Sequence, residues 1–101
     1  MKIPKSIKIF GQEVKISEVE NLVDQYGTKV DGEFKPSKNI IFIDKKLKGK
    51  ERVHTFLHEY NHAVVAAIGA YNCNLSSDLE EIIVDAIAKS LSENFILRFR
   101  A

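Results

Sequence analysis

The sequence has almost no cysteine and no long hydrophobic run. Cys73 is the one cysteine in 101 residues, so no disulfide can form within the chain, and this fits a reducing compartment such as the cytosol. No segment approaches the roughly 18 consecutive apolar residues that a membrane span requires, and the first residues contain no apolar run of signal-peptide length. We therefore expect a cytoplasmic protein without membrane contact, in which Cys73 is a small buried hydrophobic residue.

Lysine and arginine are absent from one continuous part of the chain. The net charge is +1, yet residues 53–88 contain none of the 15 basic residues. The same segment contains all three histidines and five carboxylates, namely His54, His58, His62, Glu59, Asp78, Glu80, Glu81 and Asp85. A segment with imidazoles and carboxylates but no ammonium group is suited to binding a cation. The alternative is that two helices bury apolar faces here and exclude lysine for that reason.

The hydrophobic pattern predicts one domain over residues 1–101. A composition of 45% hydrophobic and 29% charged residues is typical of a globular protein. Alternating residues predict strands at 7–10, 13–16, 33–35 and 39–43. From about Lys50 the apolar residues recur every three or four positions, which predicts a helix to near Gly69 and a second helix to about Phe95. The expected fold class is α+β, with a small antiparallel sheet of hairpins followed by two packed helices.

The predicted first helix contains the stretch His58-Glu59-Tyr60-Asn61-His62. Residues four apart lie on the same face of a helix, so both imidazoles can converge on one metal ion. This is the H-E-x-x-H arrangement of zinc peptidases, in which the glutamate takes a proton from metal-bound water. Glu59 projects from the flank of that face and is the expected general base. A short motif of this kind also occurs by accident, with the histidines on the surface or in the core.

A third ligand is expected from the second helix. Glu81 and Asp85 are four residues apart on one face, where two carboxylates repel each other unless a cation is present. We expect Glu81 to bind the metal and Asp85 to accept a hydrogen bond from the outer nitrogen of a ligand histidine. The spacing of Ser77 and Glu80 predicts a capping box, which would commit Glu80 to the helix backbone. In the alternative, Asp78 caps the helix and both carboxylates are solvated.

The motifs His58-Glu59-x-x-His62 and Glu81-x-x-x-Asp85 together resemble the paired signature of gluzincin metallopeptidases. From about Asp31 to Leu91 the chain resembles the small zincin-like proteins of bacteria and phages related to the ImmA/IrrE metallopeptidases, and also the minimal gluzincins. The resemblance implies a minimal zincin-like domain that binds one Zn²⁺ through His58, His62 and Glu81 and uses Glu59 as base. Larger gluzincins have a second lobe that forms one wall of the cleft, and the resemblance does not extend to such a lobe.

Two further side chains are candidates for the rim of the site or for an oxyanion donor. Tyr71 follows the first helix, and His54 lies on the same stripe as the other histidines. Eight residues of helix separate His54 from His62 by about 12 Å, which is too far for both to bind one ion. An ordinary histidine at the start of a helix and a packed loop tyrosine explain both residues equally well.

Three functions are therefore considered, and two of them use the metal site. The first is a zinc metallopeptidase that hydrolyses peptide bonds by a metal-activated water, with a peptide or protein as substrate. The alternative is a zinc-stabilised, non-catalytic binding or regulatory module of phage or prophage origin, whose partner is a regulatory protein. Two imidazoles with one carboxylate favour zinc over manganese or iron.

Strand 39–43 could align an extended peptide if it forms a sheet edge, or it could be an interior strand. The lysines of residues 45–50 are interpreted as a solvated loop rather than a nucleic-acid patch, because neither arginine nor an aromatic residue interleaves them. A nucleic-acid-binding accessory protein would need those lysines to carry a salt-dependent affinity.

Overall fold

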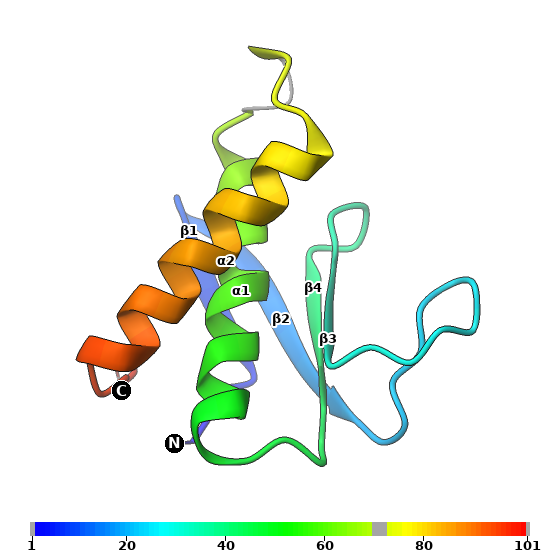
Figure 1. Cartoon of the computed structure of the whole chain (residues 1–101), viewed down its shortest axis with the longest axis vertical. Helices are drawn as coiled ribbons and strands as arrows, with labels where there is room; N and C mark the ends of the chain where they lie inside the picture. The colour runs from blue at the N-terminus through cyan, green and yellow to red at the C-terminus, as the bar shows by residue number, and fades with distance from the viewer. Residues whose placement is uncertain (1, 70–72, 101) are drawn as a thin grey trace.

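A computed structural model describes residues 2–69 and 73–100 of the chain. Strands come first along the chain and helices follow (Figure 1). The elements are β1 (Ser6–Ile9), β2 (Gln12–Val19), β3 (Gly32–Lys35), β4 (Ile40–Asp44), α1 (Gly49–Ala67) and α2 (Ser77–Asn94). This order confirms the predicted α+β class. Neither helix, in the part of the chain described, is long and apolar enough to cross a membrane.

The sheet has the strand order β1-β2-β4-β3 and is mixed rather than antiparallel throughout. The hairpins β1–β2 and β3–β4 are antiparallel, as expected. Between them β2 and β4 are parallel, with Ile16 opposite Ile41, which corrects the expectation of a purely antiparallel sheet. The reason is the long connection at residues 20–31, because it lets the second hairpin enter so that β4 runs alongside β2 in the same direction.

The position of β4 also decides which strand is an edge. β4 pairs with β2 on one side and with β3 on the other, so the interior alternative for residues 39–43 holds. Its side chains agree with this position, since Ile41 and Ile43 are fully buried. The edge beside the helices is β3, which contacts α1. Any peptide that extends the sheet near the histidines must therefore pair with β3.

Asp44, at the end of β4, fixes the connection between β2 and β3. Its buried carboxylate accepts hydrogen bonds from the backbone N–H of Lys46 at 2.9 Å and of Leu22 at 3.0 Å. The hydrogen bond from Lys46 is the main cause that holds the pKa of Asp44 below its usual range. The loop that leads into β3 is thereby tied to the interior of the sheet.

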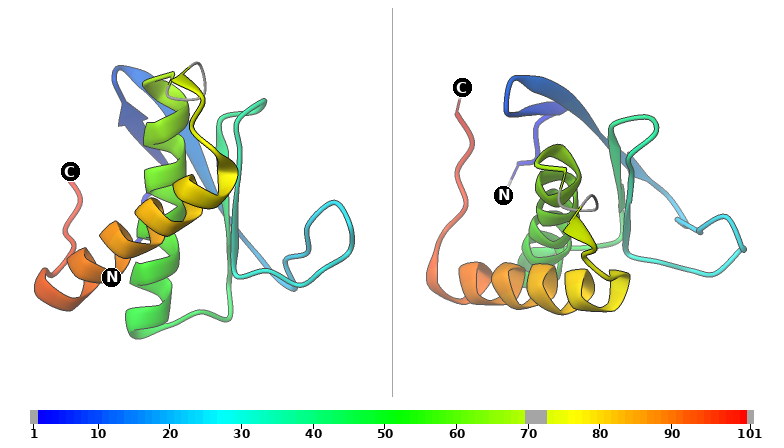
Figure 2. Two further views of the ribbon diagram at one scale, coloured as in Figure 1. Left: turned by 45° about the horizontal axis from the view of Figure 1, so that its top comes forward. Right: turned by 90° about the horizontal axis from the view of Figure 1, so that it is seen from above.

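Helix α1 packs between the sheet and α2 (Figure 2). Phe56 and Leu57 of α1 are buried with Ile41 and Ile43 of β4 in the hydrophobic core. The segment after α2 returns to this core, where the rings of Phe99 and Phe56 lie edge to face at 5.3 Å. The side of α1 that faces away from the sheet packs against α2.

Helix α2 is rotated differently from what its hydrophobic pattern suggests. It begins after Ser76, whose hydroxyl accepts a hydrogen bond from the backbone N–H of Leu79 at 3.1 Å. The predicted Ser77 to Glu80 capping box is therefore wrong, and so is the alternative cap at Asp78. The buried residues of α2 are Glu80, Val84 and Ala88. Its larger apolar residues face outward instead, with Leu79 48%, Ile82 67%, Ile83 42% and Ile87 44% exposed.

Candidate metal centre

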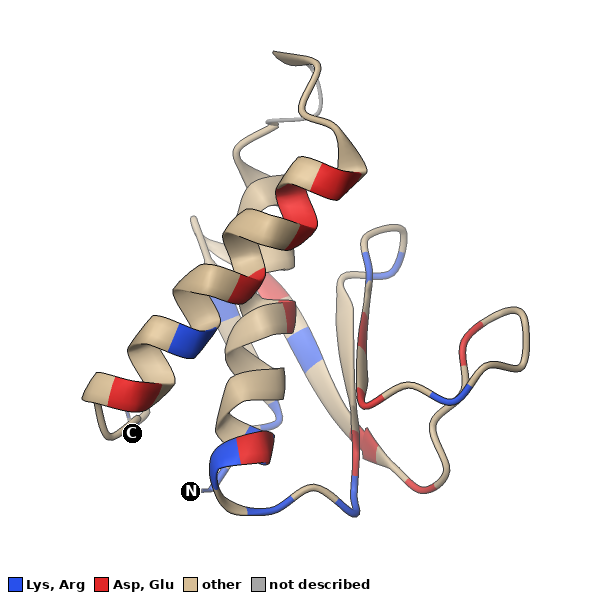
Figure 3. Cartoon of the chain, viewed as in Figure 1, with Lys and Arg blue, Asp and Glu red and all other residues tan. Residues whose placement is uncertain are grey.

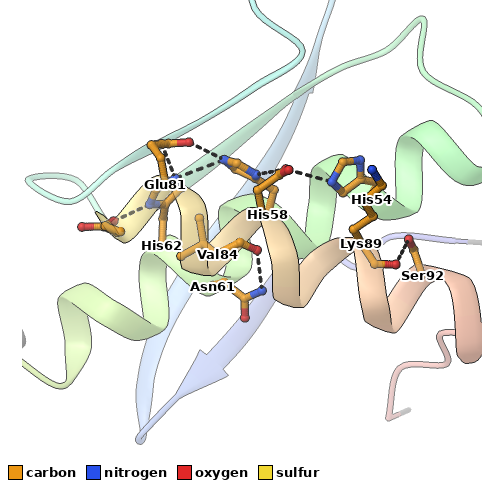
Figure 4. A network of polar contacts seen from close by, with 10 residues as sticks. His54, His58, Asn61, His62, Glu81, Val84, Lys89 and Ser92 are labelled. Atoms are coloured by element: carbon orange, nitrogen blue, oxygen red, sulfur yellow. Dashed lines mark hydrogen bonds and ion pairs between the residues drawn. The ribbon is translucent and has the colours of Figure 1, made fainter. Parts of the chain in front are cut away.

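The structure brings His58 and His62 of α1 together with Glu81 of α2. The Nε2 atoms of the two histidines are 3.2 Å apart. Glu81 reaches across from α2 and places Oε1 2.8 Å from Nε2 of His62 and Oε2 3.2 Å from Nε2 of His58. Figure 4 shows both rings turned toward this carboxylate. Two nitrogens and one carboxylate thus converge on one point between the helices, where they could hold a metal ion.

The convergence follows from the two helical patterns. His58 and His62 are one turn apart on α1 and face α2, and Glu81 lies in the second turn of α2. Acidic residues gather along the first half of α2, whereas the Lys and Arg residues of the two helices lie near the start of α1 and in the second half of α2 (Figure 3). Residues 53–88 contain no Lys or Arg, so no basic side chain of this segment competes with a metal ion for the Glu81 carboxylate.

A carboxylate also contacts the outer nitrogen of each histidine. Nδ1 of His58 lies 3.0 Å from Oδ1 of Asp85, the contact expected for that residue. Nδ1 of His62 contacts Oε2 of Glu80. Glu80 is 6% exposed and contacts this histidine. The capping box predicted for it is wrong because the helix is capped by Ser76. The signal that could have found it is the need of every ligand histidine for a partner at its second nitrogen.

These outer contacts fix which nitrogen atoms are available to a metal. In the neutral rings the proton sits on Nδ1, beside Asp85 or Glu80, and leaves a lone pair on each Nε2; this tautomer is assigned from the hydrogen-bond partners. Two lone pairs then face each other and the Glu81 carboxylate, which is a repulsive arrangement of acceptors. A proton on one Nε2 atom would give a single N–H donor for the other Nε2 and the Glu81 carboxylate. Protons on both Nε2 atoms would place two positive rings side by side. One divalent cation satisfies all three groups.

The spacing of the nitrogens also fits a tetrahedral ion. Zinc binds histidine nitrogen at about 2.0–2.1 Å, and tetrahedral angles then place two such nitrogens about 3.3 Å apart. The observed separation of Nε2 in His58 from Nε2 in His62 is 3.2 Å. The two histidine nitrogens are therefore as far apart as two ligands of one tetrahedral metal ion would be.

Glu59 lies beside these ligands on α1 and is only 8% exposed. Desolvation is the largest influence on its carboxyl group and raises its pKa from 4.5 to about 7, with a further contribution from the negative charge of Glu81. The nearby imidazole of His58 and a hydrogen bond from the backbone of Phe34 lower the pKa of Glu59. A carboxyl group with this pKa can both take up and release a proton near neutral pH.

Gly32 of β3 makes room for Glu59 and was missed by the sequence reasoning. A Cβ atom at this position would lie 2.7 Å from Cγ2 of Thr55 and 3.0 Å from Cγ of Glu59. Only glycine therefore lets the edge strand approach α1 this closely. The sequence Asp31-Gly32 by itself indicates only a turn. The close approach depends on the packing of β3 against α1.

A cleft of about 520 Å³ opens beside the ligands. The edge strand β3 forms one wall through Gly32, Glu33 and Phe34, and the first turns of α2 form part of the rest. His58, Glu59 and His62 line it as well. The cleft therefore places a sheet edge, a buried carboxyl group and the candidate metal ligands around one space.

The remaining expected residues have different outcomes. Nε2 of His54 lies 3.0 Å from the same Oδ1 atom of Asp85 that contacts His58. The hydrogen bond from His58, followed by that from His54, holds the pKa of Asp85 below its usual range. Tyr71 lies outside the described residues. Cys73 is exposed, so the expectation of a buried cysteine was wrong.

Comparison of the chain with protein-family models, with curated proteins and with solved structures finds no match. The geometry of the side chains therefore carries the functional argument.

Proposed function

We propose that this protein is a zinc-dependent metallopeptidase that hydrolyses peptide bonds. The observation that carries the proposal is the triangle of His58 Nε2, His62 Nε2 and Glu81, whose acceptor atoms face one another at 2.8–3.2 Å. Such an arrangement costs free energy unless a cation is bound. The five-residue motif that supplies both histidines also supplies Glu59, the acid–base group that peptide hydrolysis requires.

Zinc is the ion that this ligand set favours. Two imidazoles and one carboxylate leave a fourth position for water or substrate, as in catalytic zinc sites. When bound there, zinc lowers the pKa of water and polarises a carbonyl group. Asp85 and Glu80 hold the rings of His58 and His62 in the tautomer that presents Nε2 to the metal.

Glu59 is the proposed proton carrier. Its carboxylate accepts a proton from water and then gives it to the leaving nitrogen of the peptide. Burial serves this role because a carboxyl group with a pKa of about 7 can do both at neutral pH. The backbone contact with Phe34 and the absence of a side chain at Gly32 keep the group against β3, beside the cleft.

The peptide substrate is proposed to lie along β3. This strand is an edge of the sheet and forms one wall of the cleft, so its outer backbone groups can pair with an extended chain. Main-chain pairing of this kind carries little sequence information, and side-chain preference would come from contacts such as Glu33 and Phe34.

A zinc-stabilised module without activity would use the same ligands but not Glu59. The burial of Glu59 favours the peptidase, because desolvating a carboxyl group destabilises the fold and contributes nothing to metal ligation. The two functions predict the same metal content and differ in catalysis, so two experiments are needed.

The first experiment measures zinc by mass spectrometry in purified protein. The wild type should contain one zinc ion per chain, whereas His62→Ala and Glu81→Ala should lose most of it. Glu93→Gln is the control, because it removes an exposed carboxylate of α2 that belongs to neither group of candidate metal ligands. A wild type that neither contains zinc nor takes it up from solution would overturn the proposal.

The second experiment compares peptide cleavage by the wild type and by Glu59→Gln. The variant should retain zinc and lose cleavage by about 100-fold or more, which is the usual contribution of a general base. Glu93→Gln removes an exposed glutamate at the end of α2 and should cleave like the wild type. Cleavage at the wild-type rate by Glu59→Gln would remove the peptidase assignment but leave the zinc site intact.

A further inference from the structure

The outer face of α2 carries large apolar side chains that no other element of the described chain covers. Leu79, Ile82, Ile83 and Ile87 are each between 42% and 67% exposed and follow one another at helical spacing. We call these four residues the α2 stripe. The helix lies at one side of the molecule with α1 behind it, so this face is open to solvent (Figure 2). A row of large exposed aliphatic side chains on so small a domain indicates an interaction surface.

Charges beside the α2 stripe indicate what covers it. Asp78 and Lys89 are both exposed and lie on the same flank of the helix, eleven residues or about three turns apart. Two antiparallel helices can be related by a two-fold axis that is perpendicular to both helices and to the line joining them. Such an axis places the same flank of each helix on the same side of the interface. An axis that crosses α2 between Ile83 and Val84 then places Asp78 of one chain beside Lys89 of the other, twice.

The apolar residues satisfy the same register. Leu79 and Ile87 lie at similar distances on either side of that axis, so each faces the other residue of the second chain. Ile82 and Ile83 lie beside the axis, and the small Ala86 leaves room for them. One symmetry operation therefore covers the α2 stripe and pairs Asp78 with Lys89. Asp85, on the same flank, contacts His54 and His58 of its own chain.

We propose that the protein forms a homodimer in which the two α2 helices pack antiparallel through the α2 stripe. The inference does not depend on zinc or on catalysis, since the cleft lies on the side of α2 that faces α1 and β3. A pair of helices of this length buries less surface than a standard interface, so the expected dissociation constant is on the order of 10 µM.

The first test is sedimentation velocity over a range of concentrations around that value. The wild type should pass from monomer to dimer, and Ile82→Lys should raise the dissociation constant about tenfold or more. Phe10→Lys is the matched control, because Phe10 is 72% exposed but lies in the β1–β2 turn. A wild type that stays monomeric throughout, or equal effects of both substitutions, would overturn the homodimer and leave the α2 stripe to a different protein.

The second test examines the register. Asp78→Lys and Lys89→Asp should each weaken the dimer about threefold to tenfold, and the double variant should return to near the wild-type constant. Thermal unfolding of each variant controls for the loss of an acidic residue from the first turn of α2. A parallel arrangement would not bring these two flanks together, so absence of rescue would overturn the antiparallel dimer.

A cross-linking test reports the axis directly. In a Cys73→Ser background, Ile83→Cys should form an intermolecular disulfide with its own copy, because both residues lie beside the axis. Ser90→Cys should not, since its two copies would be about 20 Å apart along the helices. Efficient cross-linking at Ser90 and none at Ile83 would contradict the proposed register.

Discussion

Replacing Glu59 by glutamine should make the metal-free protein more stable at alkaline pH. The folded protein raises the pKa of Glu59 from 4.5 to about 7, mainly because the carboxyl group is buried. Between these two values the folded chain holds a proton that the unfolded chain has released. The stability of the wild type must therefore fall as the pH rises through this window. Glutamine has nearly the same size and does not ionise, so the variant avoids this loss.

The expected size of the effect follows from the shift. One pKa unit corresponds to about 1.4 kcal/mol, so moving from 4.5 to about 7 corresponds to about 3 kcal/mol. The stability of Glu59→Gln relative to the wild type should rise by about this amount between about pH 4 and about pH 8. At the acidic end both proteins carry a neutral group at position 59.

The assay is urea unfolding followed by circular dichroism at several pH values, with a chelator present to remove divalent ions. Both proteins contain the same three histidines, so their contribution largely cancels in the difference. Glu93→Gln controls for the loss of one negative charge from the surface. Saturating zinc should reduce the difference at pH 8, because a nearby cation favours the ionised carboxylate. A difference that is independent of pH, or that increases toward acid, would refute the burial argument.

Gly32→Ala should cost about 1–3 kcal/mol in urea unfolding and reduce peptide cleavage while zinc content stays the same, because the new Cβ would lie 3.0 Å from Cγ of Glu59. Glu80→Gln should weaken zinc binding about 10-fold to 100-fold in competition with a chromophoric chelator, because the amide is a poorer acceptor for Nδ1 of His62. Asp44→Asn should lower the melting temperature at neutral pH. Because the fold lowers the pKa of Asp44, the advantage of the wild type over this variant should shrink as the pH falls below the usual range of aspartate.

The candidate ligands could be placed together from the sequence because their positions depend on local geometry. The helical period alone places His58 and His62 on one face. The repulsion between Glu81 and Asp85, four residues apart, indicated that a cation lies near this pair. Both arguments use residues within one turn of a helix, and the structure brings these side chains together at 2.8–3.2 Å.

The pairing of the strands and the role of Gly32 could not be predicted, because both depend on contacts between distant segments. The parallel pairing of β2 with β4 is determined by how the segment at residues 20–31 packs, and Asp44 fixes that segment through Leu22, 22 positions away. The sequence Asp31-Gly32 is a turn signal in any context. That the same glycine admits the carboxyl group of Glu59 follows only from the packing of β3 against α1.

The rotation of α2 explains both why its apolar stripe is exposed and why Glu80 is buried. An apolar stripe of leucine and isoleucine normally faces the core, and here a different face is buried. Turning the α2 stripe inward would carry Glu81 and Asp85 away from His58 and His62 and leave four polar groups of the site without partners. The observed rotation instead buries Glu80 against His62 and exposes Ile82 and Ile83. The polar site therefore determines how α2 packs, and the exposed stripe is a consequence of that site which a second chain can cover.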